Sequence, residues 1–333
     1  MKIVMVSLTF LPKVGGLENV MSGLANEWYK KGHELTVFTD VPTNTSETEP
    51  YDIKRAFSTI DLFKKVAKAD IFLEANISLK TCWVGLLNRK KWFITHQLHY
   101  SHGKDWKGKL KNYLTKFTHN ISCSNYVANT LVGKSIVINN FFQPIFQRIL
   151  SINKTKEIVF LGRLVSDKGA AVLLRAIHLL NNKNITVTII GNGPEKVNLE
   201  KQIADLQLRN IHFAGIKKGQ DLVTELNAHK ILVVPSTWPE PYGIVALEGM
   251  ACGCLVIASN NGGLPEAVNK FGILYNDNDP QQLAIAIEKA LNNFDDYAQD
   301  EAELQRYLAN KKVEIVAQQY LDYFNVTIAT PRN

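Results

Sequence analysis

Residues 159–180 read VFLGRLVSDKGAAVLLRAIHLL, and they show the pattern on which the chain is built. The apolar start is typical of a buried strand, and the leucines and alanines at the end repeat with helical spacing. A short segment with glycines and charges separates the two. Strand–loop–helix units of this kind assemble into parallel sheets covered by helices, so the sequence predicts an α/β fold.

The same pattern recurs along the chain. In the first half we expect strands at Ile3–Leu8, Leu35–Thr39, Ile71–Glu74, Trp92–Thr95, Ile121–Ser124 and Ile136–Ile138. In the second half we expect them at Ile158–Leu161, Ile185–Ile190, Ile211–Phe213, Ile231–Val234, Leu255–Ala258 and Ile273–Tyr275. Helical periodicity is found around Leu17–Lys31, Leu62–Lys68, Lys107–Phe117, Leu173–Leu180, Leu199–Leu206, Val223–Ala228, Val245–Ala251 and Leu283–Leu291.

The segment between the halves, NNFFQPIFQRILSINKTKE at residues 139–157, breaks both periodicities and contains Pro144. Such a segment is typical of a linker. We therefore expect two doubly wound, Rossmann-like domains, at residues 1–145 and 146–310. Because open α/β sheets bind ligands beyond the carboxyl ends of their strands, the two domains are expected to face an interdomain cleft that holds the active site.

The composition excludes several protein classes. The chain has 333 residues, of which 46% are hydrophobic and 21% charged, too balanced for a disordered or fibrous protein. Four irregularly spaced cysteines argue against a disulfide framework and paired zinc knuckles, and they fit a reducing, cytoplasmic setting. No apolar run approaches the roughly 18 residues that a spanning helix needs, so we expect no membrane insertion.

Positive charge is concentrated in the first half of the chain. Residues 1–150 contain 20 Lys and Arg against 11 Asp and Glu, whereas the remainder contains 18 against 20. The first half is therefore expected to meet an anionic partner, which could be nucleic acid, phospholipid or a phosphate-bearing substrate.

Segments at two strand ends carry candidate chemistry. Gly15-Gly16 follows the first strand, where it fits either a close backbone approach to a phosphate or substrate, or an ordinary tight turn. Arg163 and Lys168 follow Gly162 at the mouth of the second sheet, and two cations there are suited to neutralise a diphosphate. As isolated residues they would be ordinary surface charges.

A third segment, PSTWPEPYGIVALEGMACG at residues 235–253, makes the ligand prediction more specific. Glu240 and Glu248 bracket a helix start at Tyr242-Gly243, where free N–H groups and the helix dipole favour an anion. Glu248 falls in the second helical turn, from which it can accept hydrogen bonds from sugar or ribose hydroxyls. Glu240 in the loop can reach another part of the same ligand.

These segments resemble the retaining glycosyltransferases of family 4, which have the GT-B fold. The resemblance rests on GRLVSDKG at 162–169, GNGPE at 191–195, the Glu240 and Glu248 pair, NGGLPEAV at 261–268 and FLPKVGGLENVMSGLANEWYKKGHELTVFT at 10–39. It implies transfer of a hexosyl or amino-hexosyl group from a UDP- or GDP-linked sugar to a saccharide or lipid-linked acceptor. The expected setting is bacterial cell-surface polysaccharide or lipopolysaccharide synthesis. The resemblance also implies a helix at residues 301–324 and packing of residues 311–333 against the first domain.

By position, the resemblance implies roles for individual residues. Arg163 and Lys168 would bind the donor diphosphate, Glu240 would contact the donor sugar, and Glu248 the nucleoside ribose. Further donor-binding positions are Gly15, Gly16, Gly191, Gly193, Tyr242, Gly243 and Ile244. His96 matches a histidine near the transferred sugar, which makes it the fourth member of a catalytic set with Arg163, Lys168 and Glu240. The family more often has aspartate where this chain has Gln97, so the hydrogen-bond partner of the His96 ring stays open.

Two segments that could suggest a metal site are assigned otherwise. The three histidines of THQLHYSHG at residues 95–103 lack a carboxylate or cysteine to complete a site. Asp277-Asn278-Asp279 resembles the acidic metal motif of the other major glycosyltransferase fold, but Asp279 before Pro280 is a good helix N-cap. We therefore expect a metal-independent enzyme without a cofactor. Cys252 and Cys254 are expected to be buried packing residues.

Basic and apolar residues are mixed in GKDWKGKLKNYLTKFTHN at residues 103–120. The apolar residues repeat at helical spacing, which fits an interfacial helix at an anionic membrane and also a surface helix whose apolar stripe faces its own core. Arg89-Lys90-Lys91 favours the membrane. We therefore expect peripheral attachment to the inner face of the cytoplasmic membrane or contact with a lipid-linked acceptor, through Trp106, Lys107, Lys109 and Lys111.

Three other functions compete with glycosyl transfer. A nucleotide-sugar epimerase can share the architecture, but it would change its substrate without an acceptor. A nucleic-acid-binding protein fits the isoelectric point near 9.0, but no aromatic-interleaved basic motif is found and the phosphate-binding segments lie in the less basic half. A non-catalytic glycan binder is disfavoured because all the implied site residues are present. We therefore expect no nucleic-acid partner.

Overall fold

The computed structural model describes residues 1–13, 15–42, 49–100, 106–180, 182, 184–276, 279–294 and 301–329. The chain separates into two compact units, Met1–Phe141 with Lys311–Asn333, and Phe142–Asn310. Each unit contains one parallel sheet with helices on it, which confirms the expected α/β class.

The first unit is built on a seven-stranded sheet in the order β3-β2-β1-β4-β5-β6-β7. Its strands are β1 (Lys2–Val6), β2 (Glu34–Thr39), β3 (Asp52–Arg55), β4 (Ile71–Ala75), β5 (Trp92–His96), β6 (His119–Ser122) and β7 (Ser135–Val137). Its α-helices are α1 (Gly16–Lys30), α2 (Thr59–Ala67), α3 (Cys82–Leu87), α4 (Trp106–Leu114), α5 (Asn125–Asn129) and α13 (Val313–Ala329). Short 3-10 turns occupy Arg89–Lys91 and Thr115–Phe117.

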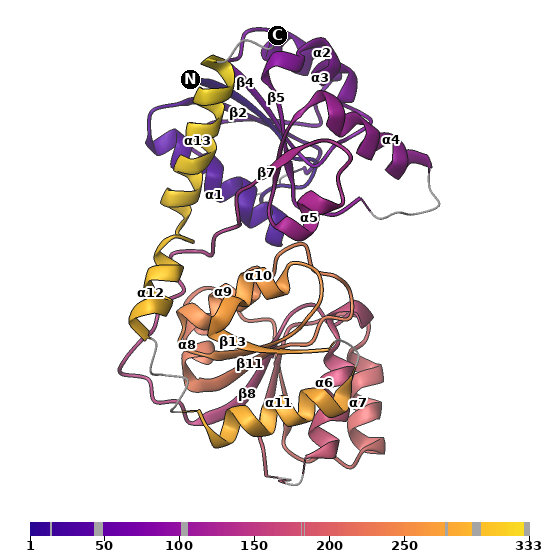
Figure 1. Cartoon of the computed structure of the whole chain (residues 1–333), viewed down its shortest axis with the longest axis vertical. Helices are drawn as coiled ribbons and strands as arrows, with labels where there is room; N and C mark the ends of the chain where they lie inside the picture. Colours follow the sequence, from indigo (N-terminus) through magenta and orange to yellow (C-terminus); the bar gives the residue numbers. More distant parts are fainter. Residues whose placement is uncertain are drawn as a thin grey trace. The chain divides into compact units, whose positions relative to one another are not determined.

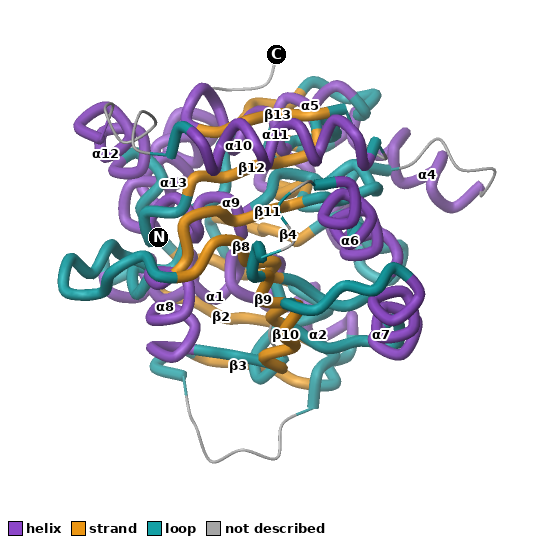
Figure 2. Tube along the Cα trace, turned by 90° about the horizontal axis from the view of Figure 1, so that it is seen from below, coloured by secondary structure: helices purple, strands orange, loops and turns teal. Residues whose placement is uncertain are grey.

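The second unit is built on a six-stranded sheet in the order β10-β9-β8-β11-β12-β13, which the strands follow from bottom to top in Figure 2. Its strands are β8 (Lys156–Leu161), β9 (Val187–Ile190), β10 (Ile211–Gly215), β11 (His229–Val234), β12 (Leu255–Ser259) and β13 (Gly272–Tyr275). Its α-helices are α6 (Ala170–Leu179), α7 (Lys196–Asp205), α8 (Gly219–Ala228), α9 (Ile244–Ala251), α10 (Leu264–Val268), α11 (Pro280–Asn292) and α12 (Glu301–Ala309). Short 3-10 turns occupy Ser166–Lys168 and Asn269–Phe271.

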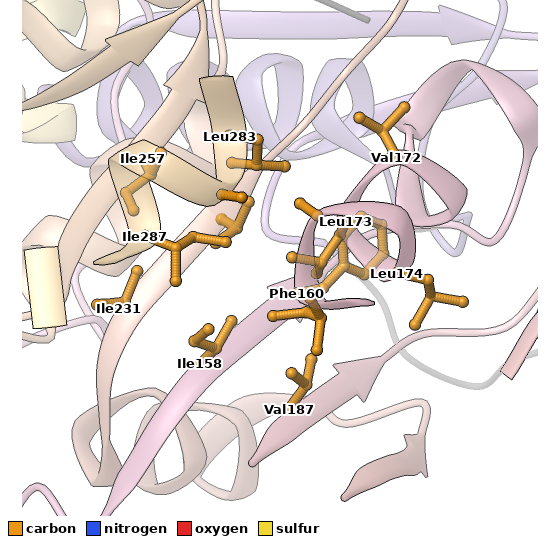
Figure 3. Close-up of a cluster of buried hydrophobic side chains, with 14 of the residues drawn as sticks. Ile158, Phe160, Val172, Leu173, Leu174, Val187, Ile231, Ile257, Leu283 and Ile287 are labelled. Atoms are coloured by element: carbon orange, nitrogen blue, oxygen red, sulfur yellow. The ribbon is translucent and has the colours of Figure 1, made fainter. Parts of the chain in front are cut away.

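The core of the second unit is a cluster of buried apolar side chains from the sheet and its helices. Ile158 and Phe160 of β8 point to the same face of the sheet because they are two residues apart. They meet Leu173 of α6 and Ile287 of α11 in one buried cluster (Figure 3). A fully buried side chain of this size stabilises the fold by about 1.5–3 kcal/mol, so the strand ends that carry the loops are fixed.

Helix α13 packs against α1 of the first unit (Figure 1). The Trp28 indole N–H donates to Ala317 O at 3.0 Å, and its ring lies 5.6 Å from that of Phe324. The Tyr320 hydroxyl shares a 2.8 Å hydrogen bond with Thr95 at the end of β5. Helix α13 is therefore part of the first unit.

Three sequence predictions of secondary structure need correction. Strand β3 was not expected, because its residues Asp52–Arg55 are mostly polar and lie at a half-exposed sheet edge. The helix expected at residues 301–324 is two helices, α12 and α13, which belong to different units. The short helices α3, α5 and α10 were also missed, because five or six residues contain too few turns to show a period.

One carboxyl is buried in the first unit. The Glu74 carboxylate on β4 accepts hydrogen bonds from the Trp92 indole, at 2.7 Å, and from the Thr81 hydroxyl. Burial nevertheless raises the pKa of Glu74 to about 7.

Candidate functional site

The candidate ligand site of the second unit lies where its strand order reverses. Strand β8 has β9 on one side and β11 on the other, so the connections after β8 and β11 leave toward opposite sides. Such a switch point leaves space for a ligand at the carboxyl edge of a parallel sheet. The segments that contain Arg163, Lys168 and Glu240 follow these two strands.

The loops after β8 and β11 are tied together through their backbones. The Thr237 and Trp238 N–H groups donate to Asp167 O at 2.9 and 3.3 Å. Gly169 is left-handed at φ +72°, and a Cβ there would lie 1.8 Å from Pro235 O. A side chain at position 169 is therefore excluded by contact as well as by conformation.

This tie brings two predicted site residues into direct contact. Lys168 Nζ lies 2.5 Å from Glu240 Oε1, which also accepts a 2.7 Å hydrogen bond from the Ser236 hydroxyl. The side chains of Lys168 and Glu240 are 26% and 14% exposed, so the ion pair is shielded but can be reached by a ligand. Arg163, on the same loop as Lys168, is exposed.

The loop after β9 packs against the loop after β8. A Cβ at Gly191, which has φ +139°, would lie 1.8 Å from Gly162 O, and one at Gly193 would lie 2.3 Å from Leu164 O. Leu164 N in turn donates to Asn192 O at 2.9 Å. The glycines therefore allow two loops to meet backbone to backbone at the carboxyl edge.

Helix α9 begins at the end of the loop that contains Glu240. Gly243 is its N-cap in a left-handed conformation, with φ +110°, and the N–H groups of Ile244 and Val245 have no intrahelical acceptor, as in the first turn of any helix. The preceding Tyr242 is 1% exposed, so its ring anchors the helix start in the protein interior. A helix start of this kind favours an anion.

Glu248 is a buried carboxyl within α9. It is 8% exposed, and burial alone raises its pKa to about 8. Among the residues that the structure describes, no side chain donates a hydrogen bond to this carboxyl. A buried acceptor without a protein donor is costly, so it is suited to ligand hydroxyl groups.

The predicted glycine pair of the first unit opens α1. Gly15 is the N-cap of this helix in an extended conformation, and a Cβ there would lie 2.5 Å from a Glu18 carboxylate oxygen. Arg55 Nη1 donates to the carbonyls of Leu11 and Val41, each at 2.8 Å, and thereby supports the loop before Gly15.

His96 ends β5 and is fully buried. One ring nitrogen, Nε2, lies 2.8 Å from Asn120 Oδ1, and the other, Nδ1, lies 3.1 Å from the Tyr100 hydroxyl. Burial lowers the pKa of His96 to about 4, so the ring is neutral near pH 7. The partner that the sequence left open is therefore Asn120. Gln97 instead donates to Thr95 Oγ1 at 2.9 Å.

Helix α4 exposes its apolar stripe. Trp106, Leu110 and Tyr113, at positions i, i+4 and i+7, are 64%, 38% and 51% exposed. Leu114 is buried against the first unit, and Lys107 and Lys109 are exposed beside the stripe. These three apolar side chains of α4 are therefore exposed, whereas Leu114 faces the core of the first unit.

The segments considered as metal motifs are only partly described. His102, Asp277 and Asn278 lie outside the described residues. Asp279 caps α11, since its side chain accepts hydrogen bonds from Gln281 N and Gln282 N at 2.9 and 3.1 Å, as expected. Within the described ranges, no three His, Cys, Asp or Glu side chains are grouped as metal ligands.

Two further sequence predictions concern buried and apolar residues. Cys252 and Cys254 are 0% and 4% exposed, which confirms that they are packing residues. Among the helices that the structure describes, none combines the length and apolar character that crossing a bilayer requires.

Sequence analysis missed several residues that support the site. Ser236 holds Glu240, and Tyr100 and Asn120 hold His96. Ser236 and Tyr100 each lie four positions from the residue that they hold, within quoted segments, so proximity along the chain was the available signal. Asn120 lies 24 positions from His96, and no local pattern predicts that contact.

Comparisons with known proteins agree with this geometry. The family described as glycosyl transferases group 1 matches residues 142–310, a little over half of the chain. D-inositol 3-phosphate glycosyltransferase of Corynebacterium jeikeium is 38% identical over 148 residues, which cover 41% of this chain and 35% of that protein. An uncharacterised glycosyltransferase of Methanocaldococcus jannaschii is 32% identical over 225 residues, which cover 63% of this chain and 62% of that protein.

The chain thus spans less than two thirds of the length of these curated relatives. Among solved structures, Anabaena HepE in complex with UDP-glucose is similar over 98% of this chain and 100% of its own, with 20% identity and a TM-score of 0.82. This likeness confirms the expected GT-B fold class. The matching region coincides with the unit that contains Lys168, Glu240 and Glu248, and the chain belongs to the glycosyl transferases group 1 family.

Proposed function

We propose that this chain is a retaining glycosyltransferase of family 4. It would move a hexosyl or amino-hexosyl group from a UDP- or GDP-linked sugar to a saccharide or lipid-linked acceptor, in cell-surface polysaccharide or lipopolysaccharide synthesis. One observation supports this most strongly: Lys168, in the segment after β8, contacts Glu240, in the loop that leads into α9, at the switch point of the second sheet. Cations and a helix start suit a diphosphate, and carboxylates suit the hydroxyls of a sugar and a ribose.

The proposed chemistry follows the charges that bond breaking creates. Cleavage of a sugar–phosphate bond builds negative charge on the diphosphate and positive charge on the sugar ring. Arg163, Lys168 and the first N–H groups of α9 would hold the diphosphate in advance, so the leaving group is stabilised without reorganisation. Front-face attack, with a leaving phosphate oxygen taking the acceptor's proton, requires no protein nucleophile. The proposal includes no metal and no cofactor.

The first unit is proposed to serve the acceptor and the transferred sugar. Gly15 and Gly16 would let a phosphate or acceptor approach the start of α1. His96 would act as a neutral, fixed group near the sugar, because both of its ring nitrogens have protein partners.

A ligand-binding measurement tests the donor site. HepE was solved with UDP-glucose, so UDP conjugates are the first choice, followed by GDP and ADP conjugates. We expect one nucleotide to raise the melting temperature equally with and without EDTA, by an amount that reflects about 2.7 kcal/mol at a hundred times Kd. Lys168→Ala should raise the Kd of that nucleotide about tenfold, because a charge-assisted contact to phosphate is lost, and so roughly halve the stabilisation at the same nucleotide concentration.

Lys156→Ala is the matched control, since Lys156 pairs with Glu225 at the opposite end of β8. It should leave the nucleotide effect unchanged. The proposal fails if no nucleotide stabilises the protein at millimolar concentration. Conversion of the nucleotide sugar without an acceptor would instead identify an epimerase, and salt-dependent binding of nucleic acid would support the third function.

We further propose that α4 attaches the protein to an anionic membrane surface. Trp106, Leu110 and Tyr113 supply an exposed apolar stripe, and the neighbouring lysines supply complementary charge. The Lys116 ammonium lies 5.1 Å from the centre of the Tyr113 ring, so charge and aromatic surface are placed together. This is the arrangement of a helix that lies in the plane of a membrane surface.

Vesicle flotation tests the membrane proposal. We expect binding at low salt to vesicles of phosphatidylcholine mixed with phosphatidylglycerol and little binding to phosphatidylcholine alone. Trp106→Ser should weaken binding about tenfold, because the most exposed ring of the stripe is lost. Ile60→Ser is the control, since Ile60 is 59% exposed on α2. A protein that transfers sugar but ignores anionic vesicles would refute the proposal.

A further inference from the structure

The hydrogen bonds around Asn120 fix which way its side-chain amide points. Asn120 is a buried residue of β6, and its Nδ2 lies 2.8 Å from Thr115 O and 2.9 Å from Lys134 O. Backbone carbonyls only accept hydrogen bonds, so the nitrogen of the amide must face them and the oxygen must point the other way. The Thr118 hydroxyl donates to that oxygen at 2.5 Å. The Asn120 side chain therefore offers an acceptor to its remaining neighbour.

That remaining neighbour is the His96 ring at the end of β5. His96 Nε2 lies 2.8 Å from Asn120 Oδ1, and both side chains are buried. An unprotonated Nε2 would place two lone pairs against each other in the protein interior, so this nitrogen must carry a proton and donate it. Because burial lowers the pKa of His96 to about 4, the ring has a single proton to place near pH 7. Nδ1 is then the unprotonated nitrogen.

The Tyr100 hydroxyl fits this assignment at the other nitrogen of the ring. Ile77 N, a backbone donor, gives its proton to the Tyr100 oxygen at 2.7 Å. The hydroxyl proton of Tyr100 can then point at His96 Nδ1, which lies 3.1 Å away. From Ile77 to Tyr100, His96 and Asn120, each group thus donates to the next, and one direction of donation satisfies the whole chain of hydrogen bonds.

We infer that Asn120 is a positioning residue that fixes the His96 ring as the tautomer with its proton on Nε2 and an acceptor at Nδ1. The ring can therefore receive a hydrogen bond from a ligand at Nδ1, where the ligand would take the place of the Tyr100 hydroxyl, but it has no proton to give. That the ligand is a hydroxyl of the transferred sugar rests on the proposed function. The tautomer does not depend on it.

Nitrogen NMR of the protein labelled with ¹⁵N-histidine tests the tautomer near pH 7. Protonated and unprotonated ring nitrogens resonate in separate regions, and their couplings to the carbon-bound ring protons distinguish Nδ1 from Nε2. His96→Gln identifies the His96 signals among those of the eight histidines. In the wild type we expect the tautomer protonated at Nε2 to exceed the other at least about tenfold. A wild-type protein with the proton on Nδ1 would overturn the inference.

Variants at the two ends of the ring show whether Asn120 sets the tautomer. Asn120→Ala removes the acceptor and should bring the two tautomers to within about threefold of each other. Asn120→Asp keeps an acceptor oxygen and should restore the proton to Nε2. Tyr100→Phe is the matched control, because it removes the partner of the other nitrogen and should leave the proton on Nε2. A tautomer that changes in Tyr100→Phe would overturn the role of Asn120, even where Asn120→Ala does not fold.

Nucleotide sugars test the contact that rests on the proposed function. Tyr100→Phe removes the protein donor to Nδ1, so a sugar hydroxyl that donates there should move the Nδ1 resonance toward the protonated region. We expect this shift with UDP-glucose, UDP-N-acetylglucosamine or GDP-mannose, and no shift with UDP or GDP alone. A bound nucleotide sugar that leaves Nδ1 unchanged would remove the sugar contact of His96, and a protein that binds none of these compounds would remove the proposed function. In both cases a proton found on Nε2 would still support the inference about Asn120.

Discussion

Replacing Glu240 by glutamine is expected to tighten nucleoside diphosphate binding about threefold to tenfold and to slow sugar transfer about a hundredfold. The two effects have opposite signs because the carboxylate contacts a group that is proposed to bind phosphate. Glu240 Oε1 lies 2.5 Å from Lys168 Nζ, so its charge partly neutralises the lysine and repels a diphosphate. An amide keeps an acceptor for Lys168 and for the Ser236 hydroxyl but removes the charge.

Transfer should slow because the carboxylate has its largest effect when the sugar becomes positively charged. In the proposed mechanism Glu240 contacts the donor sugar, and a negative charge there stabilises the transition state more than the ground state. We therefore expect kcat to fall while the donor KM stays the same or decreases. Calorimetry with the nucleoside diphosphate and steady-state kinetics with its sugar conjugate measure the two effects separately.

Glu225→Gln is the matched control for this prediction. The Glu225 side chain is 12% exposed, close to the 14% of Glu240, and it forms ion pairs with Lys156 and Lys217. Lys156 begins β8, so these ion pairs lie at the opposite end of that strand from Lys168. Its substitution should affect stability and leave nucleotide affinity unchanged. Weaker nucleotide binding by Glu240→Gln with an unchanged kcat would mean that Glu240 only holds the lysine.

The periodicity of the sequence predicted most strands because each is a short apolar run between loops, and such runs are buried whatever their neighbours. It missed β3 because an edge strand such as Asp52–Arg55 needs no apolar pattern. It could not orient α4, since an apolar stripe has the same spacing whether it faces the core or water. Burial of Leu114 beside an exposed Trp106 was visible only in the structure.

The candidate site was likewise predictable only in part from the sequence. Arg163, Lys168, Glu240 and Glu248 could be selected as candidates because glycines and strand ends mark their segments. The contact between Lys168 and Glu240 joins residues 72 positions apart, and that between His96 and Asn120 joins residues 24 positions apart. Local sequence carries residue type and spacing, but such partners are set by tertiary packing, which one sequence does not reveal.

Glu248→Gln should weaken nucleotide binding about tenfold to a hundredfold and at the same time stabilise the protein at alkaline pH. The loss of affinity follows from the proposed contact to the ribose. Ribose hydroxyls that donate to this group favour its carboxylate form, which has two acceptor oxygens, whereas an amide has only one. Calorimetry with the nucleotide that stabilises the wild type measures this effect. The gain in stability follows from burial without a partner, which raises the pKa of Glu248 from its ordinary value of 4.5 to about 8.

The sign of the stability change follows from proton binding. Between pH 4.5 and about 8, the folded protein keeps a proton on Glu248 that the unfolded chain has released, so the free energy of unfolding falls as pH rises through this range. A glutamine does not titrate, so the variant should match the wild type near pH 4.5 and exceed it by a few kcal/mol, on the order of the shift, at pH 9. Thermal unfolding at the two pH values measures the difference.

Glu74→Gln is the control that separates the effect of a buried carboxyl on stability from its effect on nucleotide binding. Glu74 lies in the first unit, and its pKa is raised to about 7 by the same cause, so its substitution should also stabilise the protein above pH 7. Glutamine can accept from the Trp92 indole and donate to the Thr81 hydroxyl, so the packing is kept. Nucleotide affinity should not change. Glu248→Gln could gain stability like Glu74→Gln and still bind nucleotide as tightly as the wild type, which would mean that the Glu248 carboxyl does not bind the ribose. A loss of nucleotide affinity confined to Glu248→Gln would mean that this carboxyl lowers the stability of the protein but is needed to bind the ligand.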